Sequence, residues 1–227
     1  MENSRSRRSS LKGFVVATHF GPTVLVVSIA FVLSRTQFST SISIAIAAAI
    51  LAGQCVVGWS NDLIDFPRDL RAARTGKPLV AGTISPAALK RAIVLALILA
   101  AALSFFGPLG LKGGALHGLG LLSATMYNIK LKSTRLSVLP YIISFGAVPW
   151  AIYISAGKHP SLWLVLAFIF FASAFHFLNV VKDLEMDIQQ GVLGLPQRLG
   201  RTRSIATAVG LIFCGFALVA MKLSSLF

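Results

Sequence analysis

The acidic residues of this 227-residue chain are few, and their grouping could support chemistry. The sequence contains only seven Asp and Glu residues against 21 Lys and Arg. Apart from Glu2, the acids fall into two short segments that also contain asparagine. The first segment, the first stripe, holds Asn61, Asp62, Asp65 and Asp69, and the second stripe holds Asn179, Asp183 and Asp187, with Glu185 between its acids.

Both stripes contain the pattern Asn-x3-Asp-x3-Asp, which predicts that their side chains lie on one face of a helix, a turn apart. Carboxylates so close together repel each other and need a compensating cation. Oxygen ligands without Cys or His favour Mg²⁺ over Zn²⁺, and Mg²⁺ takes its other ligands from water and phosphate oxygens. We therefore predict that the two stripes bind Mg²⁺ around one diphosphate. The predicted ligands are Asn61, Asp62, Asp65, Asp69, Asp183 and Asp187.

Basic residues surround the stripes and could bind the phosphate oxygens, because Arg and Lys donate to them and stabilise the charge of a leaving group. Gly76, Pro78 and Gly82 predict a turn-rich loop that holds Arg74 and Lys77 near the first stripe. Each of these basic residues could equally serve only to set the orientation of the chain in a membrane. The predicted diphosphate-binding cations are Arg68, Arg74, Lys77, Lys130, Lys132 and Lys182.

Two other interpretations of the acids stay open. The carboxylates could merely neutralise neighbouring arginines at a solvated helix end, although two matched stripes make this less economical. They could also mark an ion pathway, since carboxylates inside membranes often belong to transport. Transport sites lie near the midplane of the bilayer, whereas these stripes follow the ends of apolar segments.

The composition predicts the elements that position the stripes. Hydrophobic residues make up 56% of the chain and charged residues only 12%, about half the charged fraction of soluble domains. This excludes a soluble or disordered protein and argues against nucleic acid as a partner. Seven apolar stretches have about the 20 residues that a membrane-spanning helix needs. They cover roughly residues 13–33, 41–60, 86–106, 113–129, 137–156, 161–181 and 204–222.

The basic residues orient these seven predicted spans. With the N-terminus inside, all but four of the 21 Lys and Arg residues lie on the inner side, as the positive-inside rule expects. Both stripes then lie on that side too. We predict an all-α, polytopic membrane helix bundle with about seven transmembrane helices. A basic cytoplasmic tail (1–12) precedes one transmembrane domain (13–227).

Aromatic residues lead into the second stripe. Phe171, Phe175 and Phe177 could line an apolar chamber and face a carbocation through their π clouds. The alternative is that these rings pack between helices or face lipid.

The stripes resemble the motifs of the UbiA superfamily of intramembrane prenyltransferases. The first stripe matches the family's Asn-Asp-x-x-Asp-x-x-x-Asp in full, and Arg74 to Ser85 resembles its continuation. Asp183 and Asp187, followed by Gly191, Leu195-Pro196 and Leu199-Gly200, resemble the second motif. The family usually has nine spans, against the seven predicted for this chain.

The resemblance implies a Mg²⁺-dependent membrane prenyltransferase. It would ionise a polyprenyl diphosphate and transfer the prenyl group to an aromatic or other small acceptor, as in quinone or lipid biosynthesis. Asp65, Asp69, Asp183 and Asp187 would be the catalytic acids, and Asn61 would help to hold the metal–diphosphate. We expect an integral protein of the prokaryotic plasma membrane whose site faces the cytoplasm, and association of copies into a homo-oligomer stays open.

Two further functions remain as alternatives. A phosphoribosyl-type transferase would use polyprenyl phosphate as acceptor and a sugar diphosphate as donor, with the same diphosphate-binding residues. A transporter or a scaffolding paralogue would not be an enzyme.

Overall fold

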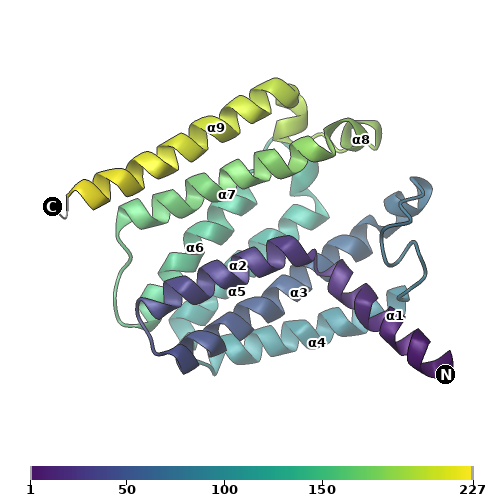
Figure 1. Cartoon of the computed structure of the whole chain (residues 1–227), viewed down its shortest axis with the longest axis horizontal. Helices are drawn as coiled ribbons and strands as arrows, with labels where there is room; N and C mark the ends of the chain where they lie inside the picture. The colour runs from purple at the N-terminus through teal and green to yellow at the C-terminus, as the bar shows by residue number, and fades with distance from the viewer. Residues whose placement is uncertain (1, 226–227) are drawn as a thin grey trace. The chain divides into compact units, whose positions relative to one another are not determined.

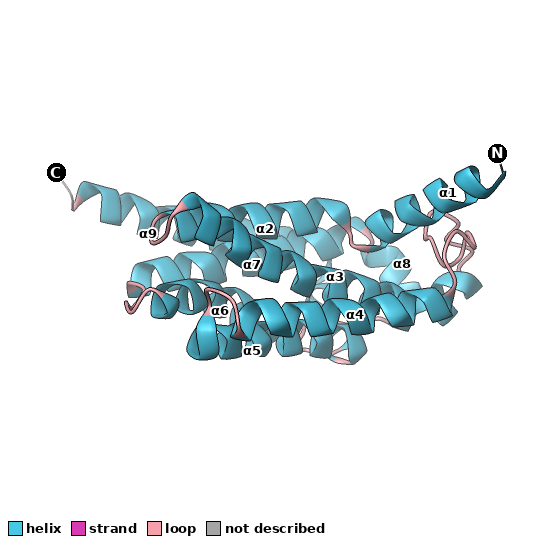
Figure 2. Cartoon of the chain, turned by 90° about the horizontal axis from the view of Figure 1, so that it is seen from below, coloured by secondary structure: helices cyan, strands magenta, loops and turns pink. Residues whose placement is uncertain are grey.

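The computed structural model describes residues 2–225, with side chains from residue 10 onwards, and consists of helices joined by loops (Figure 1). No strand occurs in this described range (Figure 2). The elements in chain order are α1 (Glu2–Ala17), α2 (Phe20–Arg35), α3 (Thr40–Arg71), α4 (Pro86–Phe105), α5 (Gly110–Ile129), the 3-10 turn η1 (Leu131–Ser133), α6 (Leu139–Ser155), α7 (Leu162–Lys182), α8 (Leu184–Gln189) and α9 (Leu195–Ser224).

The helices form two compact units, residues 1–111 and residues 112–227, and each is described by itself. In the first unit, α3 packs against both α2 and α4. In the second unit, α7 packs against α6 and lies along α9 (Figure 1). The first stripe belongs to the first unit and the second stripe to the second.

Several helices are long and apolar enough to cross a membrane, in agreement with the predicted all-α membrane fold. They are α3, α4, α7 and α9, and the bent pair α1–α2 adds a fifth candidate. The remaining predicted spans correspond to α6, a shorter apolar helix, and to α5, which contains five glycines, a lysine and a histidine. The count of seven and the orientation of the N-terminus stay predictions.

The predicted span over residues 13–33 is not one straight helix. It breaks at Thr18 and His19, where α1 and α2 meet at a bend of 63°. His19 has a left-handed backbone (φ 58°, ψ 62°), and the Thr23 hydroxyl donates to the carbonyl of Thr18 at 2.7 Å. A residue in this conformation cannot continue a right-handed helix, so the chain turns here.

A small apolar core fixes the end of α3 that carries the first stripe. Trp59 donates from Nε1 to the carbonyl of Phe14 at 3.0 Å, and the two rings meet edge to face. Behind them, Leu79 and Ile84 of the α3–α4 loop pack with Leu89 of α4. The Ser85 hydroxyl accepts the backbone N–H of Ala88 and so caps the start of α4. The loop that contains Arg74 and Lys77 is thus anchored at both ends.

Candidate functional site

The first stripe lies on α3, as predicted. Its three aspartates are buried and follow one face of the last turns of the helix. Pro67 lies inside this stretch without ending α3, which continues to Arg71. A buried carboxylate needs hydrogen bonds or a counter-charge, so the partners of these acids decide what the stripe can do.

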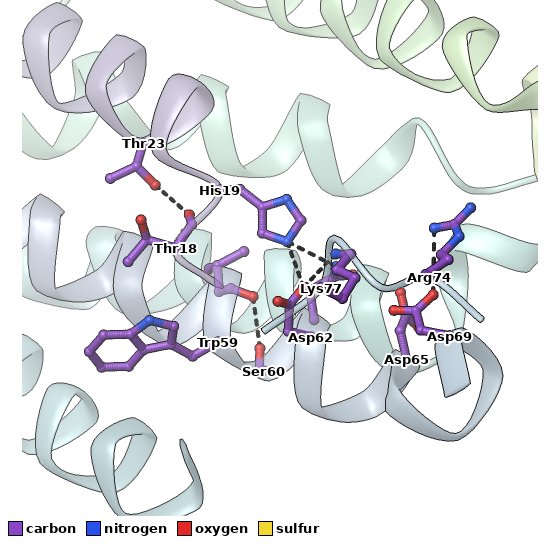
Figure 3. A network of polar contacts seen from close by, with 12 residues as sticks. Thr18, His19, Thr23, Trp59, Ser60, Asp62, Asp65, Asp69, Arg74 and Lys77 are labelled. Carbon is purple, nitrogen blue, oxygen red and sulfur yellow. Dashed lines mark hydrogen bonds and ion pairs between the residues drawn. The ribbon is translucent and has the colours of Figure 1, made fainter. Parts of the chain in front are cut away.

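Each aspartate of the first stripe has a cationic partner. The guanidinium of Arg68 donates to Asp65 at 2.9 Å, and the ammonium of Lys77 donates to Asp62 at 2.5 Å. Arg74 lies 3.5 Å from Oδ1 of Asp69, too far for a good hydrogen bond. That oxygen is buried and has no hydrogen-bond partner. Figure 3 shows Lys77 beside Asp62 and Arg74 beside Asp69.

His19 joins the first stripe although no sequence pattern pointed to it. Its Nε2 lies 3.0 Å from Oδ1 of Asp62 and 3.3 Å from Nδ2 of Asn61. Figure 3 shows the ring turned towards Asp62 from the break between α1 and α2. The one available signal was the helix-breaking run Thr18-His19 followed by Gly21-Pro22. This run indicates a break in the helix but not which residues the break contacts.

The second stripe is not one continuous helix, which corrects the prediction from its spacing. Asn179 lies near the end of α7, Asp183 lies at the junction (φ −113°, ψ 15°), and Asp187 lies on α8. The backbone of Asp187 still donates to the carbonyl of Asp183 at 2.9 Å, so the i, i+4 contact survives. Asn179 and Asp183 are exposed, and Asp187 is half-buried.

Gln197 is a second residue that the sequence did not single out. Its Nε2 donates to Oδ2 of Asp187 at 3.0 Å, and its side chain is buried. It lies in the first turn of α9, just after Gly194. A Cβ on Gly194 would come within 2.5 Å of the carbonyl oxygen of Lys132, so only glycine permits this approach. The start of α9 therefore adjoins both Asp187 and the backbone of Lys132.

Two more hydrogen bonds fix the start of α9. The hydroxyl of Ser137 accepts the backbone N–H of Leu195 at 2.9 Å. The same hydroxyl lies 3.2 Å from Nε2 of His176, a fully buried residue of α7. Gln197 thus reaches Asp187 from a turn that is tied to α7 and to the segment before α6.

Glu185 has a different environment from the acids on either side of it. It is exposed and forms a two-oxygen contact with Arg201 of α9, at 2.8 and 3.0 Å from Nη2. The hydrogen bonds from Arg201 lower the pKa of its carboxyl. An exposed pair of this kind contributes little to stability, so Glu185 is a suitable control position beside the second stripe.

The other predicted diphosphate-binding residues are in the second unit. Lys130 directly follows α5 and is exposed, Lys132 lies on η1 and is half-buried, and Lys182 is the exposed last residue of α7. Both Lys130 and Lys132 precede Ser137 in the segment that contacts the start of α9.

Two of the three predicted chamber residues, Phe171 and Phe177, pack between helices. Phe177 is 3% exposed and packs with Ala174 and Ala208. Phe171 meets the ring of Phe216 edge to face and lies over Gly215, where a Cβ would approach its ring to 2.8 Å. Phe175 is half-buried. A role of these rings around a prenyl chain stays a prediction.

Within the described part of the chain, no three His, Cys, Asp or Glu side chains come together as a metal site. Mg²⁺ usually takes only one or two carboxylates from the protein. The lack of a group of three such side chains therefore does not bear on Mg²⁺ binding. The first stripe provides carboxylate oxygens that lie among Arg and Lys side chains. That arrangement suits an anion that arrives together with a metal.

Solved structures share this fold. A UbiA homologue from Archaeoglobus fulgidus bound to GPP and Mg²⁺ matches with a TM-score of 0.79 at 16% identity, covering 92% of this chain and 77% of that one. The apo UbiA homologue from Aeropyrum pernix K1 matches with a TM-score of 0.71 at 21% identity, covering 94% and 78%. A digeranylgeranylglyceryl phosphate synthase matches with a TM-score of 0.67 at 20% identity, covering 92% and 76%.

The sequence comparison extends beyond the fold. No protein with a curated description matches the chain. The family model of the UbiA prenyltransferase family, however, matches residues 20–227, which include both stripes and the start of α9. With most of its length matched, the chain belongs to the UbiA prenyltransferase family, and it is an integral membrane protein.

Proposed function

We propose that this protein is a Mg²⁺-dependent prenyltransferase that ionises a polyprenyl diphosphate and transfers the prenyl group to an aromatic or other small acceptor. The observation that carries the proposal is the end of α3, where Asp65 and Asp69 are buried beside Arg68 and Arg74. An apolar helix that ends in paired carboxylates and guanidinium groups suits a substrate with a lipid tail and a charged head.

The residues of the first stripe fit Mg²⁺ by their chemistry. Carboxylate and amide oxygens are its preferred protein ligands, and Oδ1 of Asp69 is buried without a hydrogen-bond partner. A bound ion would supply charge neutralisation at the diphosphate. The A. fulgidus homologue with GPP and Mg²⁺ supports the assignment. Asn61, Asp65 and Asp69 would hold the metal in the first unit, and Asp183 and Asp187 would do so in the second.

The cations of this chain would act on the leaving group. When the bond between the prenyl C1 and its oxygen breaks, the electron pair leaves with the diphosphate. Arg68, Arg74 and Lys77 would donate to the oxygens that gain charge. We assign the same role to Lys130, Lys132 and Lys182. The allylic cation then forms a bond with a nucleophilic carbon of the acceptor, which finally loses a proton.

The repeated pattern Asn-x3-Asp-x3-Asp supports the same chemical role for the two stripes, and we propose that both take part in the reaction. We also propose that the site lies on the cytoplasmic face of a prokaryotic plasma membrane, and the distribution of Lys and Arg supports the choice of face.

Removal of divalent metal provides the direct test. Purified protein in detergent, given Mg²⁺, labelled prenyl diphosphates of several chain lengths and a panel of acceptors, is expected to form prenylated product. EDTA should abolish this turnover and added Mg²⁺ should restore it, because the diphosphate leaves poorly without neutralisation. Turnover that persists in EDTA would exclude the metal-dependent mechanism. Transfer of a sugar phosphate to labelled polyprenyl phosphate would instead identify the phosphoribosyl-type reaction.

Gln197 allows a second test, because it touches a proposed ligand without being one. The change Gln197→Leu keeps the size of the side chain but removes the donor to Asp187. We expect turnover or Mg²⁺ affinity to fall by roughly 10- to 100-fold, the usual effect of removing such a partner. A Mg²⁺ titration of the initial rate measures this effect.

Glu185→Gln is the matched control for Gln197→Leu, since it changes an exposed acid two residues from Asp187. Its Mg²⁺ requirement should equal that of the wild type. An unchanged Mg²⁺ requirement in Gln197→Leu would show that the contact with Asp187 has no part in metal binding.

A further inference from the structure

Asp62 differs from the other acids of the first stripe in its contacts. Two donors converge on its Oδ1, namely Nζ of Lys77 at 2.5 Å and Nε2 of His19 at 3.0 Å (Figure 3). The Asp62 side chain is only 2% exposed. Because a carboxylate only accepts, Nε2 of His19 carries the proton in this contact. That nitrogen therefore cannot also accept from Nδ2 of Asn61.

The two donors come from segments that are distant in sequence. His19 forms the break between α1 and α2, and Lys77 lies in the loop between α3 and α4. The left-handed backbone of His19 is unfavourable for a residue with a side chain, and such a conformation persists where its surroundings hold it. The bond to Asp62 is such a restraint. Asp62 thus joins both segments to α3.

These contacts make Asp62 a poor ligand for a metal. A divalent cation at Oδ1 would have to displace the ammonium of Lys77 or lie beside it, and the two positive charges repel. Oδ1 of Asp69 is more loosely paired, since it is buried, accepts no hydrogen bond and lies 3.5 Å from the Arg74 guanidinium. The same helix face therefore carries acids with different surroundings.

We propose that Asp62 is a positioning residue rather than a metal ligand. It holds Lys77 and His19 in place beside the diphosphate, while Asp65 and Asp69 bind the metal. This inference rests on the proposed function and narrows the predicted ligand set, which included Asp62.

Metal affinity, measured apart from turnover, tests the inference. Mn²⁺ replaces Mg²⁺ as the probe, and electron paramagnetic resonance measures its binding to the purified full chain. We expect Asp62→Asn to bind Mn²⁺ within about threefold of the wild type and Asp65→Asn to bind at least about tenfold more weakly. An equal loss in both variants would make Asp62 a ligand and overturn the inference.

Inorganic pyrophosphate, added with saturating Mn²⁺, tests the positioning role itself. Asp62→Asn and Lys77→Met should each weaken its binding about tenfold, and the double variant should be no weaker than the worse single variant, because both act through Lys77. Multiplying effects would overturn the inference.

Two features keep the outcomes distinct. Asp62→Asn removes the carboxylate that holds both Lys77 and His19, so a loss of the fold in that variant has to be distinguished from a loss of binding. The double variant with Lys77→Met removes both charges, and its Mn²⁺ affinity then gives the same comparison with Asp65→Asn. If Asp65→Asn and Asp69→Asn also retain Mn²⁺, the metal site of the proposed function fails. The pyrophosphate affinities of the Asp62 and Lys77 variants still test the positioning role independently.

Discussion

Asp65→Asn is expected to lower prenyl transfer by a factor of about 10² to 10³ or more while the protein still folds. The change conserves shape but removes the negative charge that would hold the metal. Losing one preorganised charge contact to a transition state has an effect of this size. The Arg68 side chain that loses its partner is 19% exposed, so water can solvate it. Initial rates at saturating Mg²⁺ and prenyl diphosphate measure the effect.

The control for Asp65→Asn is Arg71→Gln, at the last residue of α3. Arg71 is exposed, and its Nε donates to the carbonyl of Pro67 at 3.2 Å. The substitution should leave the rate within about twofold of the wild type, as a surface change away from a site does. Equal losses in the two variants would point to general damage to α3, and full activity in Asp65→Asn would refute its assignment as a catalytic acid.

Combining substitutions in the two stripes tests whether they act together. Asp183→Asn should cause a loss similar to that of Asp65→Asn. Residues that act as one unit are strongly non-additive, so the double variant should be little worse than the more severe single variant. If the two losses multiplied, the stripes would contribute independently, and the proposal that both take part in the same reaction step would fail.

The sequence predicted the parts of this site that depend on local spacing. The i, i+4, i+8 pattern of the first stripe correctly indicated a helical face, because α3 continues through Pro67 to Arg71. The same pattern misled at the second stripe, where the helix stops at Lys182 and restarts at Leu184. Spacing reports which residues could share a face, but not whether the backbone remains helical between them.

Contacts between distant residues could not be predicted. His19 and Asp62 are 43 positions apart, and no periodicity connects them. Histidine adopts a left-handed backbone more often than most residues with a side chain, but this tendency is too weak to predict a break. Similarly, Gln197 reads as an ordinary polar residue at a helix start until the fold brings it to Asp187. Asp62 and Asp65 had the same predicted role, because only their partners in the fold distinguish these two acids.

The close contact between Gly58 and the break at Thr18 leads to a prediction about stability. A Cβ at position 58 would lie 2.6 Å from the carbonyl oxygen of Thr18 and 2.9 Å from its Cα. Both atoms belong to the backbone and cannot rotate away. Gly58 therefore lets the break rest on α3 one turn before Asn61 and Asp62, which is where His19 reaches them.

Gly58→Ala is expected to destabilise the protein by about 1–3 kcal/mol, the usual cost of forcing a methyl group into a packed contact. The sign is informative, since alanine in an open helical position would stabilise by up to about 1 kcal/mol relative to glycine. The apparent melting temperature in detergent should fall. Pyrophosphate binding should weaken as well, because His19 and Lys77 share the same oxygen of Asp62.

Gly21→Ala is the matched control in the same unit. Gly21 lies in the first turn of α2, and a Cβ there would meet nothing within 4 Å. This variant should melt at or slightly above the wild-type temperature and bind pyrophosphate normally. If Gly58→Ala behaved in the same way, the contact with Thr18 would not restrain the break, and the position of His19 would have to depend on its bond to Asp62 alone.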